Sequence, residues 1–225
     1  TTGTLQFSAG ALGSAFNPYT TGTTTVTGPA VFNGRANLAV NYGHTLTLLG
    51  TSTWTQGGGS LGSAVFGGAI VNGAGAHFTD EGALASNNYK ELRRDAVGGG
   101  GTFTNLGTYT RSGLGTTRAY GFDNRGLLAI EAGTVRVDGA FRNTGTVYLA
   151  NGSTLLANDG SLANAGQLTG TGTVQVVNLF RILNNTGMID PGLATERGTL
   201  TIDGRLQMAG DGTLHIDLAQ GQNDL

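Results

Sequence analysis

Short runs in which apolar and polar residues alternate recur along the chain, most clearly at residues 133–139, 198–204 and 212–217. Each run alternates over about five positions, which is the period of a β-strand with one buried face. Gly or Asp-Gly borders these runs, and both favour tight turns. The pattern therefore predicts a chain of short strands joined by turns.

A second motif, apolar-x-Asn-x-Gly-x-apolar, repeats between these runs. The position two before Asn is Phe or Leu in every copy, and the position two after it is always Gly. A repeat of about 20 residues that holds short strands and no helix is typical of one coil of a parallel β-helix. The motif places one Asn in each of five successive repeats: Asn105, Asn124, Asn143, Asn164 and Asn185.

Stacked coils would give these Asn residues a structural role. Asn tolerates the left-handed backbone of a coil corner, and its amide can bond to the Asn of the next coil, which makes a ladder. The Gly that follows would relieve crowding at the same corner. Less regular copies at Asn33 and Asn72 extend the pattern through residues 1–78. We therefore expect a single β-solenoid domain over residues 1–225.

Residues 79–97 break this pattern, because they contain 7 of the 26 charged residues. Four residues in the segment have the spacing of one helix face: Ala85, Tyr89, Leu92 and Ala96. Gly98 follows and can end a helix. The segment is thus predicted to be a short helical insertion near residues 80–97. Such an insertion either carries a function on the outside of the rod or shields its core.

Composition excludes several classes of protein. Gly accounts for 41 of 225 residues and Cys for none, so a coiled coil and a disulfide scaffold are excluded. The net charge is −2, which disfavours nucleic acid as a partner. The sequence lacks an apolar run of about 20 residues, so no membrane span is expected. Because the chain starts and stops in mid-pattern, we expect it to be a fragment of a longer exported protein.

Candidate catalytic and metal-binding groups are few. Asp138 and Asp159 both precede Gly and are one repeat length apart, so they could stack on adjacent coils. Two carboxylates about 5 Å apart would suit a retaining glycosidase, although each Asp can equally serve its turn. His44, His77 and His215 are far apart and lack metal-ligand spacing. We therefore expect no cofactor, no metal ion and no enzyme.

Threonine offers another possibility. Alternating Thr residues at 23–27 and 45–55 could form flat arrays of hydroxyl groups like those of ice-binding solenoids. Thr also favours ordinary strands, and its outward hydroxyl keeps a sheet soluble. The Thr-x-Thr pairs do not recur at a steady coil interval, which favours the ordinary explanation.

The C-terminal half resembles a known family. Asn-x-Gly-Thr-Val units, then Ile189-Asp-Pro-Gly, then residues 198–204, 212–218 and 223–225 are similar to passenger domains of bacterial autotransporters and related large surface adhesins. The likeness covers residues 102–225, and residues 1–78 in texture. It implies a right-handed parallel β-helix and export to the bacterial cell surface, in association with the outer membrane. It carries over no catalytic residue, because the protease and esterase motifs of that family are absent.

The sequence therefore predicts an adhesin segment that mediates attachment or self-association through a repetitive surface. The expected partner is a glycan or another copy of the same rod, bound by many weak contacts. Two alternatives are a polysaccharide lyase or glycosidase on the same fold, and a purely structural stalk. Within the insertion, four residues are expected to contact an acidic or glycan partner: Tyr89, Lys90, Arg93 and Arg94.

Overall fold

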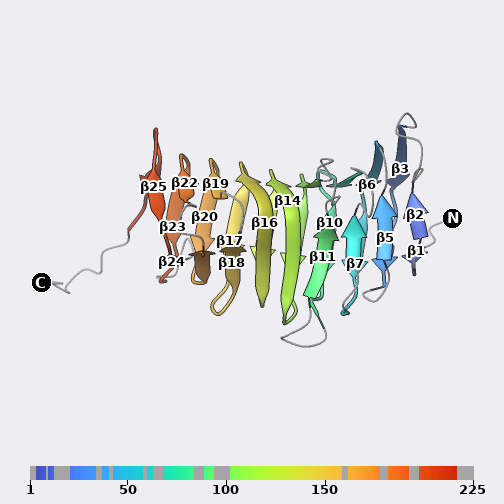
Figure 1. The fold of residues 1–225 in the computed structure, drawn as a ribbon, viewed down its shortest axis with the longest axis horizontal. Coiled ribbons are helices and arrows are strands. Elements are labelled where there is room, and N and C mark those ends of the chain that lie inside the picture. Colours follow the sequence, from blue (N-terminus) through green and yellow to red (C-terminus); the bar gives the residue numbers. More distant parts are fainter. Residues whose placement is uncertain are drawn as a thin grey trace, which may run out of the picture.

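The chain folds as an all-β parallel solenoid with about 21 residues per turn, as seen in a computed structural model (Figure 1). The structure describes residues 4–8, 10–12, 21–33, 37–40, 43–57, 60–62, 68–83, 89–93, 102–158, 162–177, 182–192 and 198–216. Among these residues every pairing between strands is parallel, and one isolated antiparallel bridge joins Gly170 to Gly192. The predicted fold class, a parallel β-solenoid, is confirmed.

One ten-stranded sheet, here called face one, runs the length of the rod. From β13 to β23 its register partners are one sequence repeat apart, for example Thr108 with Leu127 and Thr146 with Gln167. In order along the axis its strands are β1 (Leu5–Phe7), β4 (Ala30–Phe32), β7 (Thr51–Trp54), β10 (His77–Asp80), β13 (Thr108–Arg111), β15 (Leu127–Ile130), β17 (Thr146–Leu149), β20 (Gln167–Gly170), β23 (Met188–Pro191) and β26 (Thr213–Leu214).

The sixteen-stranded sheet supplies the other two sides of the rod. Two long strands, β14 (Thr116–Asn124) and β16 (Thr134–Asn143), belong to both sides, and their register shifts between Ala119 and Gly121. The first halves of β14 and β16 lie on face two with β2 (Gly10–Leu12), β5 (Asn37–Val40), β8 (Ser60–Gly62), β11 (Tyr89–Arg93), β18 (Thr154–Ala157), β21 (Thr173–Val176) and β24 (Thr201–Asp203). Their second halves lie on face three with β3 (Gly22–Val26), β6 (His44–Leu48), β9 (Ala69–Asn72), β12 (Phe103–Asn105), β19 (Leu162–Asn164), β22 (Leu183–Asn185) and β25 (Leu206–Met208).

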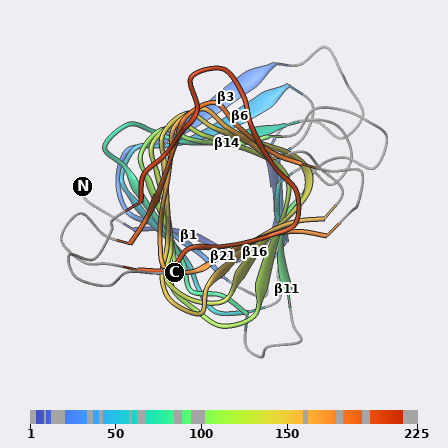
Figure 2. The ribbon, with the colours of Figure 1, turned by 90° about the vertical axis from the view of Figure 1, so that its left-hand side faces the viewer.

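Viewed along the axis, the three faces surround one continuous interior (Figure 2). Alternate residues of each strand point inward, so equivalent apolar residues of successive turns stack in columns. Phe103, Phe122 and Phe141 form one such column, with ring centroids 5.2 and 5.8 Å apart. Leu162 and Leu183 continue it. This stacking confirms that equivalent residues of successive repeats lie over one another.

Residues 79–97 do not form the predicted helix where the structure describes them. Thr79 and Asp80 end β10, and Tyr89–Arg93 forms β11, which pairs with β8 and β14. Its backbone groups complete the ladder between those strands, so pairing along the rod overrides the local helical spacing. Residues 84–88 and 94–97, with Ala85 and Ala96, lie outside the described part.

The Gly of the Asn-x-Gly motif is required by close packing between turns. A Cβ atom at Gly126 would lie 2.0 Å from the carbonyl oxygen of Gly107, and one at Gly145 would lie 2.1 Å from that of Gly126. Gly166 and Gly187 make the same close approach to the turn before them. The motif Gly thus relieves crowding, as its position in the repeat predicted.

Candidate functional site

Face one carries an uncharged outer surface over six consecutive turns. From β7 to β20 none of its outward residues is Asp, Glu, Lys or Arg, and seven of the twelve are Thr. Strand spacing separates neighbours along a column by about 4.8 Å, and alternate residues of one strand are about 7 Å apart. The two columns, in register, are Thr51, His77, Thr108, Leu127, Thr146, Gln167 and Thr53, Thr79, Thr110, Ala129, Tyr148, Thr169.

The other two faces carry charged side chains on the turns of β14 and β16. Arg118 and Arg136 are neighbours on face two, and Asp123 and Arg142 are neighbours on face three. Arg136 donates to Asp138 at 2.6 Å on the same strand. Face one is therefore uncharged on the two turns where the other faces carry these charged side chains.

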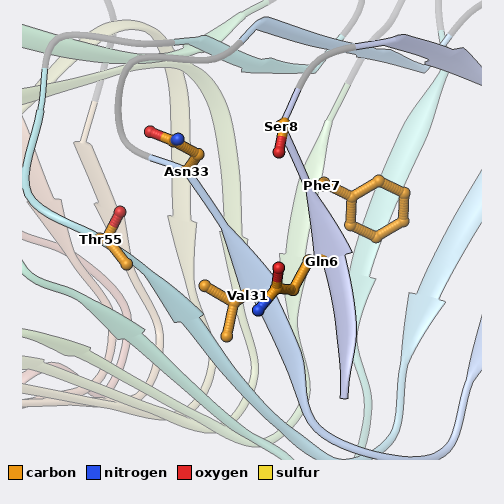
Figure 3. A pocket seen from close by; sticks show the side chains of 6 residues that line it. All are labelled: Gln6, Phe7, Ser8, Val31, Asn33 and Thr55. Carbon is orange, nitrogen blue, oxygen red and sulfur yellow. The ribbon is translucent and has the colours of Figure 1, made fainter. Parts of the chain in front are cut away.

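A small depression continues the uncharged surface towards the N-terminal end (Figure 3). It has a volume of about 200 Å³. Val31 of β4 is the register partner of Thr53, so the depression adjoins the second column. Its lining combines amide and hydroxyl groups with two apolar side chains: Gln6, Phe7, Ser8, Val31, Asn33 and Thr55.

The five predicted Asn residues form a continuous ladder inside the rod, and Asn72 extends it by one turn. Each side-chain amide donates to the amide oxygen of the next Asn at 2.5–2.8 Å. Each donor also reaches a backbone carbonyl of the following turn. All six are buried, so the ladder belongs to the core and not to a binding surface: Asn72, Asn105, Asn124, Asn143, Asn164 and Asn185.

Lys90, predicted to contact an external partner, lies inside the solenoid. Its side chain and that of Asp80 have no exposed surface, and Nζ lies 2.9 Å from Oδ1 of Asp80. The ammonium also donates to the backbone oxygen of Trp54 at 2.9 Å and lies 4.4 Å from the centroid of the Trp54 ring. Lys90 is therefore not a surface contact in this structure, because its counter-charge is in the core. The side chains of Tyr89 and Arg93, and all of Arg94, lie outside the described part, so their contacts stay predictions.

The Asp80 carboxylate is the centre of a buried polar cluster. It accepts hydrogen bonds from the backbone N–H of Gly82 at 2.9 Å, the hydroxyl of Tyr109 at 3.0 Å and the hydroxyl of Thr117. Arg111 lies beside it, with Nε 3.5 Å from Oδ2. The rest of the guanidinium donates to three carbonyl oxygens, those of Gly113, Leu114 and Gly115.

Electrostatics within the cluster shift three pKa values. Burial raises the pKa of Asp80, but the charges of Lys90 and Arg111 and the Thr117 hydrogen bond outweigh it and lower the pKa below its usual value. Burial lowers the pKa of Lys90, and Asp80 only partly opposes this. Burial and the Asp80 charge raise the pKa of Tyr109. Asp80 is thus a carboxylate whose charge faces two cations in a water-poor core.

The predicted pair of Asp138 and Asp159 is not brought together in the described part. The strand register pairs Val137 with Ala157, Asp138 accepts from Arg136, and Asp159 lies outside the described residues. Within the described ranges no three His, Asp or Glu side chains form a group that could hold a metal ion. No helix in this part is long and apolar enough to cross a membrane.

The sequence did not predict a column of Thr residues that the structure shows on face two. The two Thr arrays predicted near residues 23–27 and 45–55 meet in register where Thr23 pairs with Thr45 and Thr25 with Thr47, but Ala69 and Val71 follow on the next turn. A longer column occupies five consecutive turns: Thr116, Thr134, Thr154, Thr173 and Thr201. Its steps are uneven because the loops between turns differ in length, and only the strand register aligns its members.

No family model, no curated protein and no solved structure matches this chain. The architecture and the chemistry of its surface therefore supply the functional argument.

Proposed function

We propose that this chain is a segment of a bacterial cell-surface adhesin that attaches to a neutral glycan through face one. The observation that carries the proposal is the uncharged outer surface of β7 to β20. The resemblance of the C-terminal repeats to autotransporter passenger domains supports the location at the cell surface, outside the outer membrane.

The surface chemistry suits a neutral sugar polymer. Thr hydroxyls and the Gln167 amide can both donate and accept hydrogen bonds, as sugar hydroxyls do. Tyr148 is a partly exposed aromatic side chain on the same face, which offers an apolar surface to a sugar ring. A charged group at the contact would add a desolvation cost, and the outward residues of β7 to β20 include none.

Repetition would provide the strength of binding. Individual hydroxyl contacts are weak, but a partner that follows the rod meets similar groups on each turn. Once one contact has formed, the next is effectively intramolecular, so the overall affinity exceeds that of any single contact. A stiff parallel solenoid holds these groups at constant spacing and avoids the entropy cost of ordering them on binding.

Charge insertion tests the proposal. Thr110→Asp with Thr146→Asp places two carboxylates on face one, and Thr134→Asp with Thr154→Asp places the same change on face two. Binding to immobilised neutral and acidic polysaccharides is measured for both variants and the unmodified chain. We expect the face-one variant to bind neutral glycan at least about 10-fold more weakly, or about 1.4 kcal/mol. The face-two variant should stay within about twofold of the unmodified chain.

Four other outcomes would each replace the proposal. Concentration-dependent dimers, lost only in the face-one variant, would identify another copy of the rod as the partner. New reducing or unsaturated ends in the polysaccharide would identify an enzyme. Equal binding by both variants would place the glycan site away from face one, and no binding by the unmodified chain would leave a structural stalk.

A further inference from the structure

The Lys90 amine and the Asp80 carboxylate are held in contact where no solvent reaches either. Nζ lies 2.9 Å from Oδ1 in the core, and neither side chain has exposed surface. Because Oδ1 is bonded to the carboxyl carbon, Nζ also lies next to that carbon. Three more exposed ion pairs of the described residues join Asp to Arg or His and not to Lys: Arg125–Asp123, Arg136–Asp138 and His215–Asp190.

The second carboxyl oxygen of Asp80 is surrounded by donors. The hydroxyls of Tyr109 and Thr117 both donate to Oδ2, and Nε of Arg111 is 3.5 Å from it. That Nε has no hydrogen-bond partner in the described part of the chain. Preorganised donors around one oxygen stabilise the negative charge that develops there when a nucleophile attacks the carbon.

We propose that Lys90 and Asp80 condense to form an isopeptide bond between Nζ and Cγ. The reaction begins with transfer of a proton from the ammonium to Oδ1, which leaves a neutral amine and a carboxylic acid. The amine attacks Cγ, and the charge that forms on Oδ2 is held by Tyr109, Thr117 and Arg111. A second proton then passes from Nζ to the Oδ1 hydroxyl, and Oδ1 leaves as water.

The atoms and charges of this reaction balance within the pair. Of the three ammonium protons, two leave in the water molecule and one stays on the amide nitrogen. The carbonyl oxygen of Trp54, 2.9 Å from Nζ, is placed to accept from that remaining N–H. The ion pair and the amide both have zero net charge. Arg111 loses the neighbouring carboxylate charge on condensation but keeps its three backbone carbonyl partners.

The surroundings favour the condensed product. Replacing a buried ion pair with a neutral amide removes two charges whose desolvation is costly. Burial lowers the pKa of Lys90, which favours the neutral amine, whereas the nearby cations lower the pKa of Asp80 and oppose its protonation, so the reaction is expected to be slow. The absence of exposed surface on both side chains also protects the bond from hydrolysis. The product would link β10 to β11, so that residues 80–90 could not be extended by a pulling force.

Intact-mass measurement of the folded chain tests the proposal, because Lys90 is the sole lysine of the sequence. We expect a mass one water molecule below that calculated. Cleavage after Glu81 and Glu91 should then yield a branched peptide that joins Asp80 to Lys90. Amine-reactive reagent should leave Lys90 unlabelled after the chain is unfolded.

The matched control is Lys90→Arg, which keeps the positive charge but cannot condense under these conditions. Its mass should equal the calculated value, with a β-rich circular dichroism spectrum that shows folding. A full calculated mass for the folded unmodified chain would overturn the proposal. So would loss of water that persists in Lys90→Arg, since a succinimide at one of the Asp-Gly pairs would then be its source.

Discussion

Two regions of the rod fill the same interior in different ways. From Phe122 to Ile189 successive turns place similar inward side chains at equivalent positions, with an apolar column and a neutral Asn ladder. Around Asp80 the interior holds an anion, two cations and two hydroxyl groups that no neighbouring turn repeats. A solenoid backbone thus accepts both a periodic core and a unique one.

The difference lies in how polar groups are satisfied. In the periodic region each Asn side chain donates a hydrogen bond to the Asn of the next turn, so each added turn brings both a donor and an acceptor. In the Asp80 region the partners of the carboxylate are side chains of four different types from β11, β13 and β14. We therefore expect single changes in the Asp80 cluster to be the most damaging in the chain.

Removal of the anion should have the largest effect. Asp80→Ala would leave Lys90 and Arg111 buried without a counter-charge, at a cost of about 3–5 kcal/mol of unfolding free energy. Chemical denaturation followed by circular dichroism would measure it. Lys90→Met keeps one anion and one cation in the cluster, so it should lower the unfolding free energy less. Neither variant can form a bond between residues 80 and 90, so the difference between their unfolding free energies measures the effect of charge balance alone.

An exposed pair supplies the reference for that experiment. Asp123 accepts from Arg125 at the surface, where Arg125 is 58% exposed, and Asp123→Ala should cost no more than about 1 kcal/mol. Equal losses for Asp80→Ala and Asp123→Ala would contradict the contrast between the two regions.

Crowding between turns should have the next largest effect. Gly126→Ala would place a Cβ atom 2.0 Å from the carbonyl oxygen of Gly107, and we expect a loss of about 2–3 kcal/mol from displaced backbone. Gly152 has φ of +77° but open space around it, so Gly152→Asn should cost under about 1 kcal/mol. Thermal unfolding of both variants would compare them. A milder effect at Gly126 than at Gly152 would mean that backbone conformation, not packing, explains the motif Gly.

Interruption of the ladder should have a smaller effect. Asn143→Ala would remove the acceptor of the Asn124 amide and the donor to Asn164, at a cost of about 1–3 kcal/mol. Asn185 ends the ladder, where its amide meets the sulfur of Met208 at 3.6 Å, so Asn185→Ala should cost less. The ladder is not cooperative if urea denaturation gives the same loss for both.

The Thr column of face two should tolerate change best. Thr154→Val keeps the shape of a partly exposed strand residue, and we expect the unfolding free energy to stay within about 0.5 kcal/mol. A larger loss in the same denaturation assay would show that the Thr hydroxyls of adjacent turns stabilise one another.

Repetition made the periodic region predictable from sequence. The motif Asn and Gly recur because each turn makes the same contacts with the turn before it, so spacing alone located the ladder. The Asp80 cluster repeats nowhere in the described turns, and its members come from β10, β11, β13 and β14. Nothing local marks Lys90 as a core residue, since a charged side chain is ordinarily exposed.

Local sequence also failed to predict the structure of Tyr89–Arg93. The apolar positions of residues 85–96 fit one helix face, yet Tyr89–Arg93 forms a strand because β8 and β14 offer it backbone partners on both sides. The Thr column of face two and the uncharged stretch of face one could likewise not be predicted from sequence. The loops between turns vary in length, so only the strand register shows which residues of successive turns are neighbours.

The sequence alone determined that strands stack in parallel turns, each one repeat long, because an internal repeat needs only its own copies as partners. The tertiary structure decided what lies inside the turn of Asp80 and which stretch of face one has no charged side chain on its outer surface. Both depend on which residues of different turns come to share a column, and that follows from strand pairing over the whole length of the solenoid.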